Sequence, residues 1–225
     1  MIPYFEWHTF FLGPIPLQVW GFWVALGIVV ASVIATKRLR AFGIQKEPVL
    51  DLFVWVLVAA FLGARVFHIV FYEPQFFLAN PFEIFKIWHG GLSSYGGFVG
   101  AALGFWLFYK KKGSGWLKKV SLIKFFDELS LAALWGWMIG RIGCFMIHDH
   151  WGAPCDCLLA VNKPEGARLD MALLEILSLL PLGIFLVLWR NKKKPDGFVS
   201  AVVLVYYGVV RFLLDFWRAT DIIQA

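Results

Sequence analysis

Charged residues are scarce in this chain, and two long stretches contain none. Only 16% of the 225 residues are Asp, Glu, Lys or Arg, against about 25% in a typical soluble domain. Residues 17–36 and 92–109 carry no charge at all. Four further apolar runs carry one or two charges each, at 52–72, 129–147, 169–189 and 198–217. This composition excludes an ordinary soluble globular protein.

The six apolar runs have the length of membrane spans. At a rise of about 1.5 Å per residue, about 20 helical residues cross the ~30 Å hydrocarbon core of a bilayer. Backbone groups inside a bilayer must find hydrogen-bond partners within the protein, which favours a helix for each run. We therefore predict an all-α fold, a polytopic transmembrane helical bundle of about six spans. Because there is no convincing internal repeat, we assign residues 1–225 to one membrane-embedded domain.

The positive charges are clustered, and the clusters predict the orientation of the chain. Lys and Arg number 21 against 15 acidic residues, and fourteen of the 21 lie at 37–46, 110–124 and 190–194. These clusters follow the first, third and fifth apolar runs. Cytoplasmic loops are enriched in Lys and Arg, so these connections are predicted to be cytoplasmic and the N-terminus to lie outside. The basic balance thus reflects topology, and no nucleic-acid partner is expected.

A few ionisable residues interrupt the apolar runs, although a central Arg costs roughly 2.5–3.5 kcal/mol to insert. Arg65, Arg141 and Arg211 each lie about 18–20 Å along their spans from the predicted cytoplasmic edge. Glu175 and Asp215 lie near that depth. Three arginines facing two carboxylates leave one cation that a lipid phosphate near the outer surface could bind by bidentate hydrogen bonds. A purely structural ion-pair network is the alternative.

Two glycine-containing segments are more specific than the charges. The first reads GARVFHIVFY at 63–72 and is followed by WHGGLSSYGGFVG at 88–100. The second reads GRIGCF at 140–145, with Trp151 and Gly152 shortly after it. These segments resemble the prolipoprotein diacylglyceryl transferase family, bacterial enzymes that lipidate lipoprotein precursors. The likeness covers most of the chain but lacks the family's last span, so a divergent or C-terminally shortened member is expected.

The resemblance implies a defined reaction at the outer leaflet of the bacterial plasma (inner) membrane. Members of the family transfer diacylglyceryl from phosphatidylglycerol to a cysteine thiol and release glycerol phosphate. That cysteine belongs to the lipobox in the signal peptide of a prolipoprotein. The expected partners are therefore phosphatidylglycerol, the lipobox and the membrane, and no cofactor is implied.

The resemblance also implies roles for particular residues. The expected catalytic residues are Tyr95, Arg141, Asp149, Arg211 and Asp215. The residues expected to bind the phospholipid are Arg65, Gly96, Gly97, Arg141 and Arg211. Tyr95 stands where the family has His or, in some branches, Tyr. A tyrosine with a reference pKa of about 10 is a poor base unless neighbouring cations lower that pKa, so proton removal and positioning of the thiol both remain open for Tyr95.

Two other functions remain open from the sequence. His148, His150, Cys155 and Cys157, with Asp149 among them, could form the zinc site of a membrane hydrolase. The simpler interpretation is a solvated loop in which Cys155 and Cys157 pair where the surroundings are oxidising. A non-catalytic lipid-binding homologue is also possible, because the family's Asn in the second segment is Cys here. We expect no bound metal, since arginines can stabilise a leaving phosphate without a Lewis acid.

The remaining pattern residues are interpreted as structural. Gly96, Gly100 and Gly104 repeat every four positions, and Gly136 and Gly140 share that spacing. Small residues at this spacing let membrane helices approach closely. His68 is interpreted as a hydrogen-bonded packing residue and not as a catalyst.

Overall fold

The computed structural model describes residues 1–86, 90–113, 115, 119–189 and 192–219. The chain forms two compact units. Unit 1 comprises Met1–Arg38 and Ser121–Ala225, and unit 2 comprises Leu39–Val120. Among the described residues, five helices are long and apolar enough to cross a membrane, which confirms the prediction of a polytopic helical membrane protein. The assignment of residues 1–225 to one functional domain stays a prediction.

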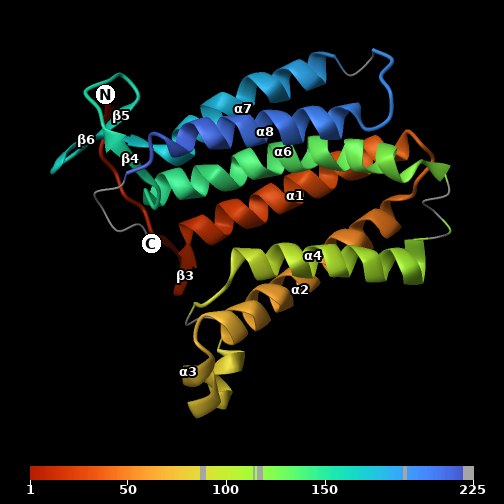
Figure 1. The fold of residues 1–225 in the computed structure, drawn as a ribbon, viewed down its shortest axis with the longest axis horizontal. Coiled ribbons are helices and arrows are strands. Elements are labelled where there is room, and N and C mark those ends of the chain that lie inside the picture. The colour runs from red at the N-terminus through yellow and green to blue at the C-terminus, as the bar shows by residue number, and fades with distance from the viewer. Residues whose placement is uncertain (87–89, 114, 116–118, 190–191, 220–225) are drawn as a thin grey trace. The chain divides into compact units, whose positions relative to one another are not determined.

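Unit 1 holds four of the five long helices (Figure 1). They are α1 (Val19–Arg40, whose last two residues are counted in unit 2), α6 (Leu122–Ile147), α7 (Met171–Leu188) and α8 (Phe198–Asp215). Helices α6 and α7 each begin at a side-chain cap that accepts an otherwise unpaired backbone N–H. The Ser121 hydroxyl accepts from Lys124, and the Asp170 carboxylate accepts from Leu173.

Helices α6, α7 and α8 share one apolar core. The buried side chains in contact there are Leu131, Leu134, Met138, Leu179, Leu182, Leu186 and Val199. Helices α1 and α6 approach each other through glycines, since a Cβ atom added at Gly136 would lie 2.7 Å from the Gly27 carbonyl oxygen. Because lipid tails are as apolar as leucine, such close contact stabilises helix pairs by van der Waals packing more than by exclusion of water. The packing role expected for Gly136 is confirmed.

Unit 2 is built on two helices that lie side by side (Figure 1), α2 (Lys46–Phe71) and α4 (Ser94–Phe108). A Cβ atom at Gly63 would lie 2.5 Å from the Gly96 carbonyl oxygen and 2.8 Å from Cα of Gly100. The four-residue glycine spacing therefore serves close helix packing, as predicted. The connection from α2 to α4 contains the short helix α3 (Pro74–Ala79) and the 3-10 turn η1 (Pro81–Phe85).

The predicted number of about six span-length helices is one too high for the described residues. The run at 92–109 forms α4, which has 15 residues and continues as the π-helical turn η3 (Tyr109–Gly113). Ser93 caps α4, because its hydroxyl accepts the N–H of Gly96. Helix α4 begins only after the cap Ser93, and the π-helical turn follows it from Tyr109. The α-helical segment is therefore shorter than a membrane span.

The all-α prediction is also wrong in part, because unit 1 contains strands. A four-stranded sheet has the order β1-β5-β6-β4, with β1 (Ile2–Pro3) parallel to β5 (Ala160–Lys163). Strands β6 (Gly166–Asp170) and β4 (Trp151–Pro154) complete it in antiparallel pairing. A separate hairpin joins β2 (Thr9–Leu12) to β3 (Ile15–Gln18). These strands lie between the apolar runs or at their first residues, where hydropathy carries little information on strand pairing.

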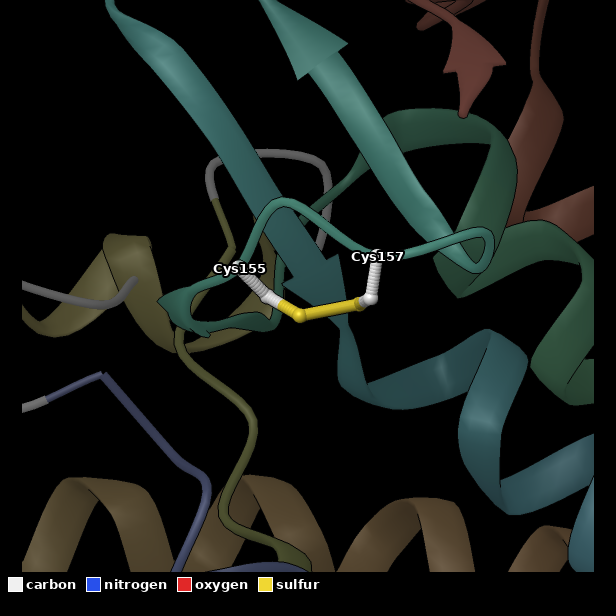
Figure 2. The surroundings of a disulfide bond; sticks show 2 residues. All are labelled: Cys155 and Cys157. Carbon is white, nitrogen blue, oxygen red and sulfur yellow. A yellow bond between two sulfur atoms is a disulfide. The ribbon is translucent and has the colours of Figure 1, made fainter.

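A disulfide bond closes the loop between β4 and β5. It joins Cys155 to Cys157, which are separated by one residue (Figure 2). The pairing considered from the sequence is therefore present. Cys144 is a free, buried thiol on α6.

The predicted orientation can be tested on the basic loop after α4. Lys112 is exposed, and its Nζ lies 3.2 Å from an Asp51 carboxylate oxygen. In a background without native cysteines, Lys112→Cys should resist a membrane-impermeant thiol reagent in intact cells and react after lysis. Glu165→Cys, in the loop predicted to lie outside, should react in both conditions. Labelling of Lys112→Cys from outside would overturn the orientation.

Lys118 and Arg190 of the basic clusters lie outside the described residues.

Candidate active site

The second glycine segment places Arg141 in a buried ion pair within unit 1. Arg141 lies on α6 and Glu175 on α7, and Nη2 of the arginine lies 2.9 Å from Oε2 of the glutamate. The exposed fractions of the two side chains are 12% and 1%. A buried charge is tolerated when it is paired and hydrogen-bonded. The neutralisation of an intramembrane arginine by Glu175, considered from the sequence, is therefore observed.

Two aromatic residues to which the sequence analysis gave no role lie beside this pair. Trp137 donates its indole N–H to Oε1 of Glu175 at 2.6 Å, and its ring lies 5.1 Å from the guanidinium carbon of Arg141. Tyr207 of α8 meets the Trp137 ring edge-on, with ring centroids 6.0 Å apart. The sequence did offer one sign of the contact between Trp137 and Arg141, because residues four apart on a helix share a face. That spacing places Trp137 beside Arg141.

The guanidinium of Arg141 keeps donor capacity beyond Glu175. Its Nη1 lies 3.7 Å from the sulfur of Cys144, a weak acceptor, and its Nε is buried without a hydrogen-bond partner among the described residues. Arginine carries five N–H donors in a planar fork that matches phosphate oxygens. An oxyanion at this position would therefore meet donors that the protein does not saturate.

Arg211 forms another ion pair of unit 1, near the end of α8. Its Nη2 lies 3.2 Å from Oδ1 of Asp215, at the expected i,i+4 spacing. Arg218 also approaches that oxygen, at 3.9 Å. The Arg211 side chain is 28% exposed, more than Arg141, and can be reached by a ligand. Tyr207 lies one turn before Arg211 on the same helix face, and its ring contacts Trp137, which lies beside Arg141.

The loop after α6 contains Asp149 between two histidines. His148 adopts a left-handed backbone conformation (φ 50°), and its Nδ1 lies 2.8 Å from Oδ2 of the α7 cap, Asp170. Both of these side chains are fully buried. His150 lies 3.0 Å from Asp149, and the pKa of its imidazole is raised by that carboxylate against the opposing effect of burial. Asp149 therefore forms an ionic contact with His150 of the same loop.

The alternative zinc site is not formed. The thiols of Cys155 and Cys157 are consumed by their disulfide (Figure 2), and His148 is bound to Asp170. Among the residues that the structure describes, no group of three or more His, Cys, Asp or Glu side chains is arranged to hold a metal ion. His148, His150, Cys155 and Cys157 therefore do not form the zinc-binding site that the hydrolase hypothesis requires.

Tyr95 belongs to unit 2, where it lines an open cavity. It is the second residue of α4 and is 71% exposed. The cavity has a volume of about 360 Å³. Its lining is His68, Tyr72, Gly91, Leu92, Ser93, Ser94 and Tyr95. The phenol therefore faces a space large enough for part of a ligand.

Arg65 is buried in unit 2, and backbone carbonyls surround it. The side chain donates at 2.6 Å to the oxygen of Glu83 and at 3.0 Å to that of Gly91. Further acceptors are the carbonyls of Ile84, Lys86 and Gly90. The guanidinium also lies 5.0 Å from the Phe77 ring centre. Arg65 therefore holds the connection between α2 and α4, and its predicted contact with phospholipid stays a prediction.

Gly96 and Gly97 begin α4 beside Tyr95. Gly96 lies directly against α2, where a side chain would collide with Phe67. A side chain at Gly97 would meet only ordinary contacts, the nearest at 3.8 Å from Ala64. The position of Gly96 is explained by helix packing. The predicted phospholipid contact of both glycines stays a prediction.

Comparisons with known proteins agree with the resemblance seen in the motifs. The family model described as prolipoprotein diacylglyceryl transferase matches residues 8–225. Enzymes named phosphatidylglycerol–prolipoprotein diacylglyceryl transferase from Pseudomonas paraeruginosa and Pseudomonas aeruginosa are each 32% identical over 216 residues, covering 93% of this chain and 79% of the relative. The enzyme of that name from Pseudomonas fluorescens is 31% identical over 219 residues, with the same coverage. The chain therefore belongs to the prolipoprotein diacylglyceryl transferase family.

Proposed function

We propose that this chain transfers diacylglyceryl from phosphatidylglycerol to the lipobox cysteine of prolipoproteins, at the outer leaflet of the bacterial inner membrane. Its family membership and the names of its relatives support this activity. The observation that carries the proposal is Arg141, which the Gly-Arg-x-Gly motif supplies. It is buried and held by Glu175, yet its Nε has no acceptor in the described protein. A donor that the protein leaves without an acceptor supports phosphate binding by this arginine.

The reaction requires stabilisation of a departing anion. A thiolate attacks the glyceryl carbon that bears the phosphate, the C–O bond breaks, and glycerol phosphate leaves with an additional negative charge. Preorganised donors aimed at developing charge are worth most in a site with little water. In this proposal Arg141 provides the forked donor, and Glu175 and Trp137 fix its orientation. Arg211 supplies a second cation, which Asp215 orients.

The nucleophile must be formed before it attacks, because the thiolate and not the thiol is reactive. We assign thiol activation to the side of unit 2 that carries Tyr95 and its cavity. Arg65 fixes the carbonyls of Gly90 and Gly91, so it shapes one wall of that cavity without needing to touch the lipid. We assign Asp149 to the catalytic loop in unit 1, where its carboxylate lies 3.0 Å from His150.

The activity can be tested directly. Purified protein in vesicles containing phosphatidylglycerol should add one diacylglyceryl mass to a lipobox peptide and release glycerol phosphate in equal amount. A peptide with serine in place of the lipobox cysteine should remain unmodified. A folded protein that retains phosphatidylglycerol but produces no mass change would favour the non-catalytic lipid-binding alternative.

Removal of divalent metal should leave this activity intact. The arginines stabilise the leaving phosphate electrostatically, and no step of the proposed reaction requires a Lewis acid. Turnover measured with and without a strong chelator should agree within about twofold, and zinc or magnesium added back should have no effect. Loss of turnover that is restored by one metal would contradict the arginine-only mechanism.

A further inference from the structure

His68 shares the cavity of Tyr95, although the sequence suggested only a packing role for it. It lies in the last turn of α2, and its side chain is 16% exposed. Besides the cavity of about 360 Å³, it lines a second one of about 250 Å³ with Arg65, Glu73 and Gly91. Among the described residues that line either cavity, His68 carries the only imidazole.

The contacts of His68 fix the ring without enclosing it. The imidazole stacks on Tyr72 with ring centroids 5.4 Å apart, and the edge of Phe77 lies at 6.2 Å. Its Nε2 lies 3.9 Å from Oε2 of Glu73, whose side chain is 55% exposed. This separation is longer than a hydrogen bond but short enough for the carboxylate to stabilise an imidazolium ion. A histidine supported by an acidic residue and facing a cavity has the features of a general base.

The glycine-rich segment is shaped to fit this ring. Gly91 has φ +78°, a conformation that favours glycine. A Cβ atom there would lie 2.7 Å from Nε2 of His68 and 2.9 Å from Nη1 of Arg65. Arg65 donates to the carbonyl oxygens of both Gly90 and Gly91. The backbone of the motif is therefore held against the imidazole, at the edge of the cavity that Tyr95 lines.

The chemistry favours an imidazole over a phenol for removing a thiol proton. Reference pKa values are about 6.5 for histidine, about 8.5 for cysteine and about 10 for tyrosine. A base works best when its pKa lies near the operating pH, and a neutral phenol has no basic site of useful strength. Tyr95 can instead donate its O–H to the substrate and position it. Of the two side chains, His68 is the one suited to accept the proton.

We propose that His68 is the general base that deprotonates the lipobox thiol, with Glu73 supporting its protonated form and Tyr95 positioning the substrate. This inference rests on the proposed function. The proton moves from the sulfur to the imidazole, the sulfur–carbon bond forms, and the carbon–oxygen bond to phosphate breaks. Glycerol phosphate carries away the electron pair, and the imidazolium returns its proton to this product or to water. Atoms and charge balance without a further reactant.

The central test is His68→Gln in the peptide lipidation assay. We expect kcat to fall at least 100-fold, within the typical range of general-base catalysis, while KM for phosphatidylglycerol changes less than threefold. His8→Gln, an exposed histidine in unit 1, should behave as wild type. Melting in detergent and retention of phosphatidylglycerol check that the protein is folded. A folded His68→Gln protein with activity within threefold of wild type would overturn the assignment.

The pH profile separates a base from a structural residue. Activity of His68→Gln should rise about tenfold per pH unit up to the ionisation of the peptide thiol near pH 8.5, because only ionised peptide then reacts. A merely structural role predicts an equal loss at every pH. Tyr95→Phe should keep the wild-type profile at lower kcat. If Tyr95→Phe shows the alkaline rescue and His68→Gln does not, Tyr95 is the base and the assignment to His68 is wrong. The ionisable groups that line these cavities with His68 are Arg65, Tyr72, Glu73, Glu83 and Tyr95.

A second variant covers the case in which His68→Gln does not fold. Glu73→Gln removes an exposed carboxylate and should fold. The amide keeps the shape of Glu73 but removes the charge that faces the imidazole at 3.9 Å, so kcat should fall about tenfold while KM for phosphatidylglycerol changes less than threefold; an unchanged kcat would contradict the proposal. The wild-type assay keeps the two hypotheses apart. No transfer by wild type refutes the proposed function, whereas an active wild type with an unaffected His68 variant refutes only the base assignment.

Discussion

Arg141→Lys is expected to lower turnover by one to three decades although the positive charge is kept. Lysine cannot place one nitrogen 2.9 Å from Glu175 and present others to a phosphate, because an ammonium lacks the planar fork. Loss of one preorganised donor to a developing anion typically costs on the order of 2–4 kcal/mol. The measurement is kcat and KM with phosphatidylglycerol vesicles and a lipobox peptide.

The separate effects of the substitution on kcat and on KM show whether Arg141 acts mainly in the transition state or already in the ground state. If it meets charge that develops on the departing phosphate, kcat falls and KM is little changed. If it holds the phosphate equally in the ground state, KM rises instead. We expect the first result, because a ground-state anchor would be served by lysine. Arg40→Lys, exposed at the end of α1, is the matched control. Full activity of a stable Arg141→Lys or Arg141→Ala protein would remove Arg141 from the mechanism.

The charge count does not say which arginine lacks a carboxylate partner, and only the structure shows that it is Arg65. The sequence suggested that three arginines faced two carboxylates and left one cation unpaired. Arg65 is hydrogen-bonded to neutral carbonyl oxygens of residues 83, 84, 86, 90 and 91. Every residue has a carbonyl, so no residue type signals such a partner. Arg141 and Arg211 do have the acidic partners that the count allowed, Glu175 and Asp215.

The long helices were predictable because their requirement is local. A membrane span needs about 20 apolar residues in succession, and that property can be read from the chain alone. Strand β1 pairs with β5 across more than 150 residues, and no local pattern announces such a pairing. The same limit applies to His68. Its position on α2 was visible, but the cavity around it depends on how Gly91 folds back from a later segment.

Removal of Glu175 is expected to have the largest effect on stability. In Glu175→Ala, Arg141 is left as a buried, unpaired cation and the indole N–H of Trp137 loses its acceptor. Breaking a buried pair in this way typically costs about 3–5 kcal/mol. In a chain of this length, that corresponds to a decrease in melting temperature of roughly 6–20 °C in detergent. Glu165→Ala, whose side chain is 75% exposed, should shift the melting temperature very little.

Two further variants separate stability from catalysis. Glu175→Gln keeps the shape and an acceptor for Trp137 but removes the charge, so it should melt closer to wild type than Glu175→Ala while losing turnover. The double variant Arg141→Met, Glu175→Leu removes both charges together. Replacing a buried pair by apolar residues of similar volume is often neutral or stabilising, and lipid surroundings strengthen that tendency. We expect the double variant to melt near the wild-type temperature without measurable lipidation. A double variant as unstable as Glu175→Ala would show that the pair supports the fold itself, whereas a stable and active one would exclude both residues from the reaction.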